Sequence, residues 1–203
     1  MAHSIVQARA VHEIDRCVVS TDDPEIAAIA RRYGAEVIVR PAELASDTAT
    51  TASVARHALE RLGGGSEGDG DALVTMQPTC PMRPLALVRE AVRLFGAGDC
   101  DSVVSVTLSR EKVGRLADGF FEPEYNVGTR SQDLPPKYFE NGLVYVSRAD
   151  LVRDGGDLFG RRVMALAVDP LYARADIDTE LDFVIAEFLF EKYRSHFAQP
   201  NMV

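Results

Sequence analysis

The chain has 203 residues, of which 46% are hydrophobic and 26% are charged, a balance typical of a globular protein with one sizeable core. Its 31 acidic residues outnumber its 22 basic residues and give a formal net charge of -9, which argues against nucleic acid or an anionic membrane as a partner. The sequence has neither a membrane-spanning hydrophobic run nor the pattern of a signal peptide, and its 3 cysteines are too few for a disulfide framework. We therefore expect a cytoplasmic protein.

Segments with strand character alternate with segments of helical periodicity through the first half of the chain. Strands are expected at residues 17–21, 36–39, 72–77 and 102–106. Between them, hydrophobic residues recur at helical spacing, and Asp23 followed by Pro24 is typical of a helix start. Strands that alternate with helices of about 10–15 residues predict an α/β fold with a mainly parallel sheet and helices on both faces.

The pattern changes after Thr107. Residues 108–140 are rich in glycine and proline and have no helical stripe, so we expect an irregular or β-hairpin excursion from the sheet. Strand character returns at residues 141–147 and 163–168, and a capping-box pattern at Thr179 predicts the start of the last helix. The buried face of that helix is expected to consist of Leu181, Ile185, Phe188 and Leu189.

A glycine-rich segment at residues 63–71 contains a literal match to the dinucleotide-binding pattern G-x-G-x-x-G. That pattern binds phosphate when a strand precedes it and a helix follows, because the phosphate then lies at the N-terminus of the helix. Here the order is reversed, and Glu67, Asp69 and Asp71 would repel phosphate. We therefore interpret the segment as a flexible linker.

Two carboxylates near the C-terminus form a candidate metal site. Asp176 and Asp178 are two residues apart, so in an extended segment their side chains point to the same side. Carboxylates this close repel each other unless a cation lies between them, and oxygen ligands suit Mg²⁺. The alternative is that Asp178 or Thr179 caps the following helix and Asp176 is solvated.

Two loops that follow predicted strands carry candidate binding residues. Ligands of open parallel sheets bind beyond the carboxyl ends of the strands, where Gln77 and Thr79 would present hydrogen-bonding groups. Arg40 follows an earlier strand and would pair with phosphate or carboxylate, with Asp47 orienting it and Thr51 capping the next helix. The alternative for both loops is an ordinary turn between a strand and a helix.

Taken together and in this order, five segments resemble the CMP-N-acetylneuraminate synthetases, which are acylneuraminate cytidylyltransferases. The segments are VVSTD at 18–22, RPAELASDTATT at 40–51, QPTCPMR at 77–83, NGLVYV at 141–146 and DIDTELDF at 176–183. The similarity extends over nearly the whole chain. The RPxxLAxDxxT stretch favours this family over the related CMP-KDO synthetases.

The resemblance implies a Rossmann-like nucleotidyltransferase domain formed by residues 1–107 and 163–203, with a dimerisation excursion at residues 108–162. It implies Mg²⁺-assisted transfer of CMP from CTP to a sialic-type 2-keto sugar acid (a nonulosonic acid), with release of pyrophosphate. Asp176 and Asp178 match the family's catalytic, metal-binding Asp-x-Asp.

The other site residues follow from the same resemblance. Arg40 and Thr51 match nucleotide-binding positions. The positions that face the sugar acid are matched by Gln77, Thr79, Tyr145 and Phe159. Phe159 would be contributed across a homodimer. Arg130 precedes a serine where the family has a second arginine, which makes Arg130 a candidate substitute for binding the substrate carboxylate.

The N-terminus departs from the family pattern. Family members begin with a strand and a Gly-Gly-Ser loop that wraps the CTP phosphates, whereas this chain starts at what corresponds to the following helix. Absence of that central strand would leave backbone groups unpaired, each at a cost of about 1–3 kcal/mol. The sequence is therefore either an N-terminally shortened version of a longer enzyme or a degenerate member of the family. Two other functions also stay open: a non-catalytic member that acts as a sugar-acid-binding dimer scaffold, and a nucleotidyltransferase acting on a sugar phosphate.

Overall fold

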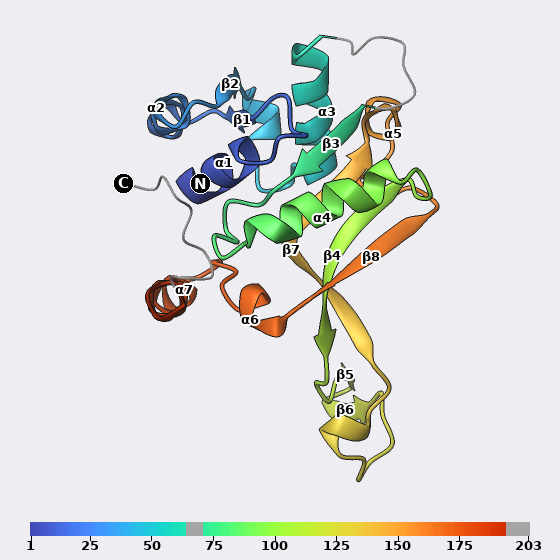
Figure 1. Cartoon of the computed structure of the whole chain (residues 1–203). Helices are drawn as coiled ribbons and strands as arrows, with labels where there is room; N and C mark the ends of the chain where they lie inside the picture. The colour runs from blue at the N-terminus through green and yellow to red at the C-terminus, as the bar shows by residue number, and fades with distance from the viewer. Residues whose placement is uncertain (64–70, 194–203) are drawn as a thin grey trace.

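The computed structural model describes residues 1–63 and 71–193, which form an α/β core with a narrow projecting arm (Figure 1). The helices are α1 (Ala2–Arg9), α2 (Pro24–Arg32), α3 (Thr51–Arg61), α4 (Leu85–Gly96), α5 (Ala149–Arg153), α6 (Pro170–Ala173) and α7 (Glu180–Lys192). The strands are β1 (Val18–Thr21), β2 (Glu36–Val39), β3 (Ala72–Thr75), β4 (Ser102–Ser109), β5 (Gly114–Ala117), β6 (Phe120–Pro123), β7 (Lys137–Arg148) and β8 (Val163–Val168). Most of the glycine-rich segment at 63–71 lies outside the described residues. No described helix is both long and apolar enough to cross a membrane.

The main sheet has the strand order β3-β7-β4-β8. Strands β4 and β8 are parallel, whereas β7 is antiparallel to both of its neighbours, so β3, β4 and β8 point in the same direction. The chain passes from β4 to β7 through the arm rather than through a crossover helix, and a connection of that kind makes the returning strand antiparallel. The result is a mainly parallel arrangement with one reversed strand.

A second, separate sheet contains only β1 and β2, which are parallel. Among the described strands, β1 pairs with β2 alone and β3 with β7 alone, so backbone hydrogen bonds do not join the two sheets.

Alternate residues of β4 and β7 pack against opposite faces of the main sheet. Val103, Val144 and Val146 lie in a cluster with Val88 of α4 on one face. Neighbouring residues such as Val104 lie in a second cluster with residues of α3 and α5. Because side chains of a strand alternate between faces, this pattern confirms a sheet covered by helices on both sides.

The arm consists of the outer halves of β4 and β7 and the antiparallel β5–β6 hairpin, which confirms the predicted hairpin excursion (Figure 1). The predicted excursion at 108–162 also contains residues 141–147 of β7, which lie within the main sheet. The division into two domains at 108 and 162 stays a prediction. The part that projects from the core contains fewer residues than the predicted segment.

At the base of the arm, the pairing of β4 with β7 shifts register between Val104 and Val106. The buried side chain of Asn141 lies at this irregularity. Its Oδ1 accepts from Ser105 Oγ at 2.6 Å, and its Nδ2 donates to Thr107 Oγ1 at 2.9 Å. The amide therefore satisfies polar groups where the regular ladder is interrupted.

Helix α7 begins as predicted but faces differently. Thr179 accepts from the backbone of Asp182, and the Asp182 side chain accepts from the backbone of Thr179, which confirms the capping box. The predicted buried face is wrong for three of its four residues, since Leu181, Ile185 and Phe188 are exposed. The helix packs through Ala186 and Leu189 instead. The helix has apolar side chains of its own on all faces, so periodicity could not identify the face that packs against the rest of the protein.

Candidate functional site

Two segments that are distant in sequence meet beside the end of β3. The loop at residues 77–83 follows β3, and residues 175–179 precede α7. The backbone N–H of Ile177 donates to the carbonyl oxygen of Thr79 at 3.0 Å, which holds the two segments together. This contact brings the predicted residues Gln77, Thr79 and Asp176 into one region of the molecule.

Cys80 lies buried beneath this meeting point. Its Sγ is 3.3 Å from Oδ1 of Asp176 and 3.5 Å from the carbonyl oxygen of Asn141. Burial, followed by the charge of Asp176 and its hydrogen bond, raises the pKa of Cys80 to about 12. At neutral pH the thiol therefore keeps its proton and donates it in a hydrogen bond.

Gly142 makes room for this packing. Its φ of +69° lies in the left-handed region, which glycine adopts without strain. A Cβ at this position would collide with Oε1 of Gln77 and would lie 3.0 Å from Sγ of Cys80. The absence of a side chain on Gly142 therefore allows Gln77 and Cys80 to pack directly against β7.

The loop at 77–83 is also held by a buried guanidinium. Arg83 donates to the carbonyl oxygens of Leu143 and Gln77, to Gln7 Oε1 at 3.0 Å and to Ser4 Oγ at 3.3 Å. Burial lowers the pKa of Arg83 to about 10, and no carboxylate among the described residues forms an ion pair with it. Arg83 thus ties the loop to both α1 and β7.

The two aspartates occupy different environments. Asp176 is half-buried above Cys80, whereas Asp178 is exposed, and the cap of α7 is Thr179 rather than Asp178. Among the described residues, no group of three or more histidine, cysteine, aspartate or glutamate side chains could hold a metal ion. Two carboxylates nevertheless fit Mg²⁺, which is commonly bound by one or two carboxylates together with water and substrate phosphates.

Tyr145 and Phe159 lie next to each other in the same chain. Their ring centroids are 6.0 Å apart with an interplanar angle of 37°, and the Tyr145 hydroxyl donates to Oε2 of Glu140 at 3.4 Å. Burial, followed by the charge of Glu140, raises the pKa of Tyr145 to about 12. Phe159 thus packs within its own protomer, and its contribution across a homodimer stays a prediction.

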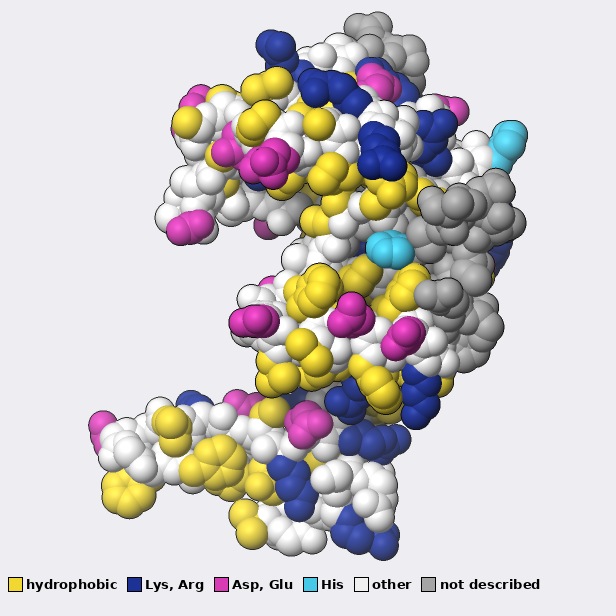
Figure 2. All heavy atoms as spheres, turned by 90° about the vertical axis from the view of Figure 1, so that its left-hand side faces the viewer, with side chains coloured by type: hydrophobic (Ala, Val, Ile, Leu, Met, Phe, Trp, Pro, Cys, Tyr) yellow, Lys and Arg dark blue, Asp and Glu magenta, His cyan; other side chains and the backbone are white. Residues whose placement is uncertain are grey.

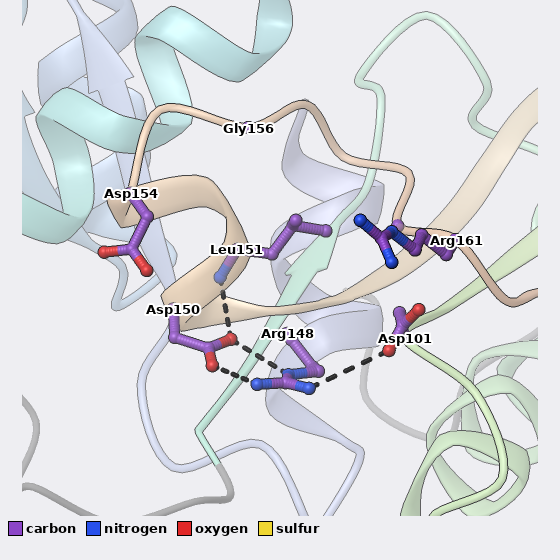
Figure 3. Close-up of a pocket in the computed structure, with 8 residues that line it drawn as sticks. Asp101, Arg148, Asp150, Leu151, Asp154, Gly156 and Arg161 are labelled. Atoms are coloured by element: carbon purple, nitrogen blue, oxygen red, sulfur yellow. Dashed lines mark hydrogen bonds and ion pairs between the residues drawn. The ribbon is translucent and has the colours of Figure 1, made fainter.

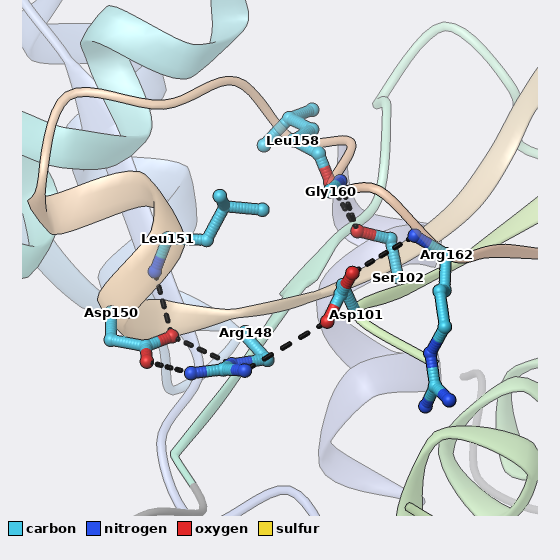
Figure 4. A network of polar contacts seen from close by, with 8 residues as sticks. All are labelled: Asp101, Ser102, Arg148, Asp150, Leu151, Leu158, Gly160 and Arg162. Atoms are coloured by element: carbon cyan, nitrogen blue, oxygen red, sulfur yellow. Dashed lines mark hydrogen bonds and ion pairs between the residues drawn. The ribbon is translucent and has the colours of Figure 1, made fainter. Parts of the chain in front are cut away.

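A pocket of about 380 Å³ lies at the C-terminal end of β7, which is the end away from the arm (Figure 3). Its lining includes Asp101, Arg148 and Asp150, and Arg148 lies between the two aspartates. The neighbouring network is also paired internally, since Asp101 accepts from the backbone of Arg162 and Ser102 donates to the carbonyl of Leu158 (Figure 4). None of the residues predicted for the site lines this pocket.

Comparison with known proteins identifies the family. Residues 1–62 match a family described as cytidylyltransferase. The chain is 32% identical to "Post-translational flagellin modification protein B" of Campylobacter coli, covering 95% of this chain and 84% of that protein. It is 30% identical to the CMP-N,N'-diacetyllegionaminic acid synthase of Campylobacter jejuni, covering 93% and 83%. It is also 30% identical to the N-acylneuraminate cytidylyltransferase of Escherichia coli, covering 95% of this chain but 46% of that protein.

The chain belongs to the acylneuraminate cytidylyltransferase family. It is therefore a nucleotidyltransferase. The fold agrees, since a solved CMP:2-keto-3-deoxy-manno-octonic acid synthetase in complex with CTP matches with a TM-score of 0.63 at 13% identity. That match covers 94% of this chain and 86% of the other.

Two residues that match nucleotide positions of the acylneuraminate cytidylyltransferases lie in the N-terminal part of the chain. Arg40 follows β2 and donates to the backbone and the hydroxyl of Ser20. Thr51 is the exposed first residue of α3, and the predicted cap there is wrong by one residue, since Thr50 accepts from the backbone of Ser53 at 3.1 Å. Neither Arg40 nor Thr51 hydrogen-bonds to Asp176 among the described contacts, and their nucleotide roles stay predictions.

Arg130 lies on the arm, where its Nε donates to Oδ2 of Asp133 at 2.7 Å. Both side chains are largely exposed. Within one chain, Arg130 is engaged locally. Its proposed contact with a substrate carboxylate stays a prediction.

Sequence reasoning missed Cys80 and Arg83 as parts of the site. Both lie inside the QPTCPMR segment, which was recognised as a motif but not resolved into separate roles. Apart from the neighbouring Gln77 and Thr79, the partners of both residues lie 60 or more positions away in sequence, so only the folded chain reveals them.

Proposed function

We propose that this chain transfers CMP from CTP to a nonulosonic acid, a sialic-type 2-keto sugar acid, and releases pyrophosphate. The observation that supports this most directly is the half-buried Asp176, held next to Gln77 and Thr79 at the end of β3. Relatives named for transfer to acylneuraminate and to diacetyllegionaminic acid support the same substrate class.

In this proposal, Asp176 and Asp178 hold Mg²⁺, and the ion, when bound, offsets negative charge on the CTP phosphates. The anomeric hydroxyl oxygen of the sugar acid bonds to the α-phosphorus and loses its proton to solvent, while the bond from that phosphorus to the leaving pyrophosphate breaks. The chain contributes orientation rather than a covalent intermediate.

Four residues orient the two substrates. Gln77 and Thr79 would donate and accept hydrogen bonds to the sugar acid from a loop that Arg83 anchors and that packs against β7 where Gly142 leaves room. Tyr145, backed by Phe159, would form an aromatic wall beside them. Arg40 would pair with a CTP phosphate, for which its planar guanidinium is well suited.

We also propose that the chain acts as a homodimer. The arm exposes large hydrophobic side chains that its own chain leaves uncovered, including Leu116, Phe120, Phe121 and Val127. Figure 2 displays hydrophobic side chains gathered along the arm and on the layer next to it. Exposed apolar surface of this kind is typical of protein interfaces.

The decisive experiment measures pyrophosphate release from CTP and Mg²⁺ with a panel of nonulosonic acids, with 3-deoxy-manno-octulosonic acid as the related control. Turnover with one or more nonulosonic acids is expected. Binding of a sugar acid without turnover would favour the non-catalytic alternative, and turnover only with a sugar phosphate would overturn the proposal. A version with the family's strand and Gly-Gly-Ser loop placed before Met1 would test how far the phosphate loop limits the rate.

A further inference from the structure

The thiol of Cys80 donates a hydrogen bond to the carboxylate of Asp176, with Sγ 3.3 Å from Oδ1. Cys80 is 1% exposed, so substrate cannot reach the sulfur directly. The sulfur lies 3.3 Å from Oδ1 of Asp176 and farther, at 3.9 Å, from Oε1 of Gln77 and Oγ1 of Thr79, so its strongest influence on the site would act through Asp176. That makes Cys80 a candidate for a positioning role.

The surroundings of Cys80 restrict where its sulfur can lie. The hydrogen bond from the backbone N–H of Ile177 to the carbonyl oxygen of Thr79 holds residue 80 next to residue 176. On the other side, the sulfur lies 3.5 Å from the carbonyl oxygen of Asn141, and Gly142 leaves room for it against β7. The thiol is thus wedged between β7 and the carboxylate, and its short side chain has few alternative conformations there.

We propose that Cys80 is a positioning residue that orients the carboxylate of Asp176 for binding a divalent cation. This inference rests on the proposed function, in which Asp176 and Asp178 hold Mg²⁺. The thiol restrains rotation of the carboxylate by donating to Oδ1. Because a thiol is a weak donor, it competes little with a cation for the oxygen lone pairs.

The role of Cys80 matches the general behaviour of groups that support metal ligands. Hydrogen-bond partners of ligating carboxylates set ligand orientation, and removing them typically reduces metal affinity by about 10–100-fold. The effect expected for Cys80 is at the lower end of that range, because the thiol is neutral and weakly polar. It should change metal affinity without changing which sugar acid is used.

The test measures binding of Mn²⁺ to the whole chain by electron paramagnetic resonance, without substrates, in parallel with the Mg²⁺ dependence of pyrophosphate release. Cys80→Ala is expected to weaken Mn²⁺ binding by about 10-fold and to raise the half-saturating Mg²⁺ concentration by a similar factor. Cys80→Ser retains a donor and is expected to stay within about 3-fold of the wild type. The matched control is Cys100→Ala, which removes a buried thiol from the α4 face of the sheet.

Two results would overturn the inference. One is unchanged Mn²⁺ affinity in folded Cys80→Ala. The other is a folded Cys80→Ser variant that binds Mn²⁺ about 10-fold more weakly than the wild type, as expected for Cys80→Ala. Because Cys80→Ser can be measured by itself, the inference stays testable if Cys80→Ala does not fold. A purely structural role would lower the melting temperature and leave the Mn²⁺ affinity of the folded protein unchanged. If the wild type makes pyrophosphate and Cys80→Ala has the same half-saturating Mg²⁺ concentration and the same Mn²⁺ affinity, the inference alone fails, whereas a wild type that neither binds Mn²⁺ nor turns over removes the proposed function as well.

Discussion

The two halves of β7 lie in opposite environments although they form one continuous strand. Residues 141–147 are all buried between β3 and β4, whereas residues 137–140 are all exposed on the arm. Both halves pair with β4, so backbone hydrogen bonding does not distinguish them. The difference is in the side chains, which are covered by helices along the inner half and left uncovered along the outer half.

The inner half of β7 stabilises the fold, whereas the outer half offers exposed side chains for contact with a partner. Burial of apolar side chains such as Leu143 and Val144 stabilises the folded core. Tyr138 and Phe139 lose this contribution in a single chain because solvent still reaches them. The inner half of β7 begins at Asn141, whose carbonyl oxygen contacts Sγ of Cys80. The candidate site therefore lies where the two environments meet.

The largest expected effect comes from truncating the same residue type in the two regions. Leu143→Ala, at a fully buried position, should reduce the free energy of unfolding by about 2–5 kcal/mol. Leu116→Ala, at a position that is 78% exposed on the arm of a single chain, should change the free energy of unfolding of the monomer, measured in a dilute sample, by less than about 0.5 kcal/mol. Urea denaturation measures both. Equal losses for the two variants would contradict the separation of core and arm.

A substitution at the candidate site should affect activity without affecting stability. Asp178→Asn removes one of the two carboxylates and should reduce Mg²⁺-dependent turnover by roughly 100-fold or more, because one carboxylate holds the ion poorly. Since Asp178 is exposed, the melting temperature should stay close to that of the wild type. Pyrophosphate release and thermal melting are the two measurements. Unchanged turnover would exclude Asp178 from the metal site.

A charge on the arm should affect assembly rather than folding. Phe120 is 75% exposed in the single chain, and Phe120→Asp would place a carboxylate in the proposed dimer interface. Sedimentation velocity should detect a dimer for the wild type and a monomer for the variant, with similar circular dichroism spectra. A wild type that sediments as a monomer would contradict the dimer and the role given to Phe159.

The smallest expected effect concerns the cap of α7. Thr179→Ala removes the N-cap hydroxyl and should cost about 1 kcal/mol of unfolding free energy near neutral pH. Hydrogen bonds from the Thr179 side chain and backbone hold the pKa of Asp182 below its ordinary value. The contribution of Asp182 is therefore present above its unfolded pKa and is lost as pH falls through the folded value. Urea denaturation at several pH values should find the difference between wild type and variant narrowing in acid, and a difference independent of pH would contradict this coupling.

Local patterns predicted local features well. The strands at 36–39 and 163–168 and the capping box at Thr179 agree with the structure because each depends on residues close in sequence. The helices α5 and α6 were missed, since at 5 and 4 residues they are too short to display periodicity. The predicted buried face of α7 was wrong because tertiary contacts, rather than the helix itself, select the face that packs.

The candidate site was predicted only in part, because some of its contacts join residues that are distant in sequence. Sequence order and motif spacing identified Asp176, Gln77 and Thr79, which the structure brings into one region. The partners that hold them, Cys80 and Arg83, depend on contacts across 60 or more positions and have no local signature. The predicted contribution from Phe159 concerns a second copy of the chain, and that from Arg130 concerns a bound substrate, so a single chain without ligands tests neither.

The position of β7 in the sheet also constrains the order in which the protein can fold during its synthesis. β7 lies between β3 and β4, yet it follows both of them in the chain, with the β5–β6 hairpin made before it. At synthesis rates of about 5–20 residues per second, β3 waits several seconds for its pairing partner to leave the ribosome. Until then β3 and β4 have unpaired edges, and the many contacts between residues distant in sequence slow closure further. The nascent chain is therefore most exposed to aggregation, and most dependent on chaperones, just before the inner half of β7 emerges.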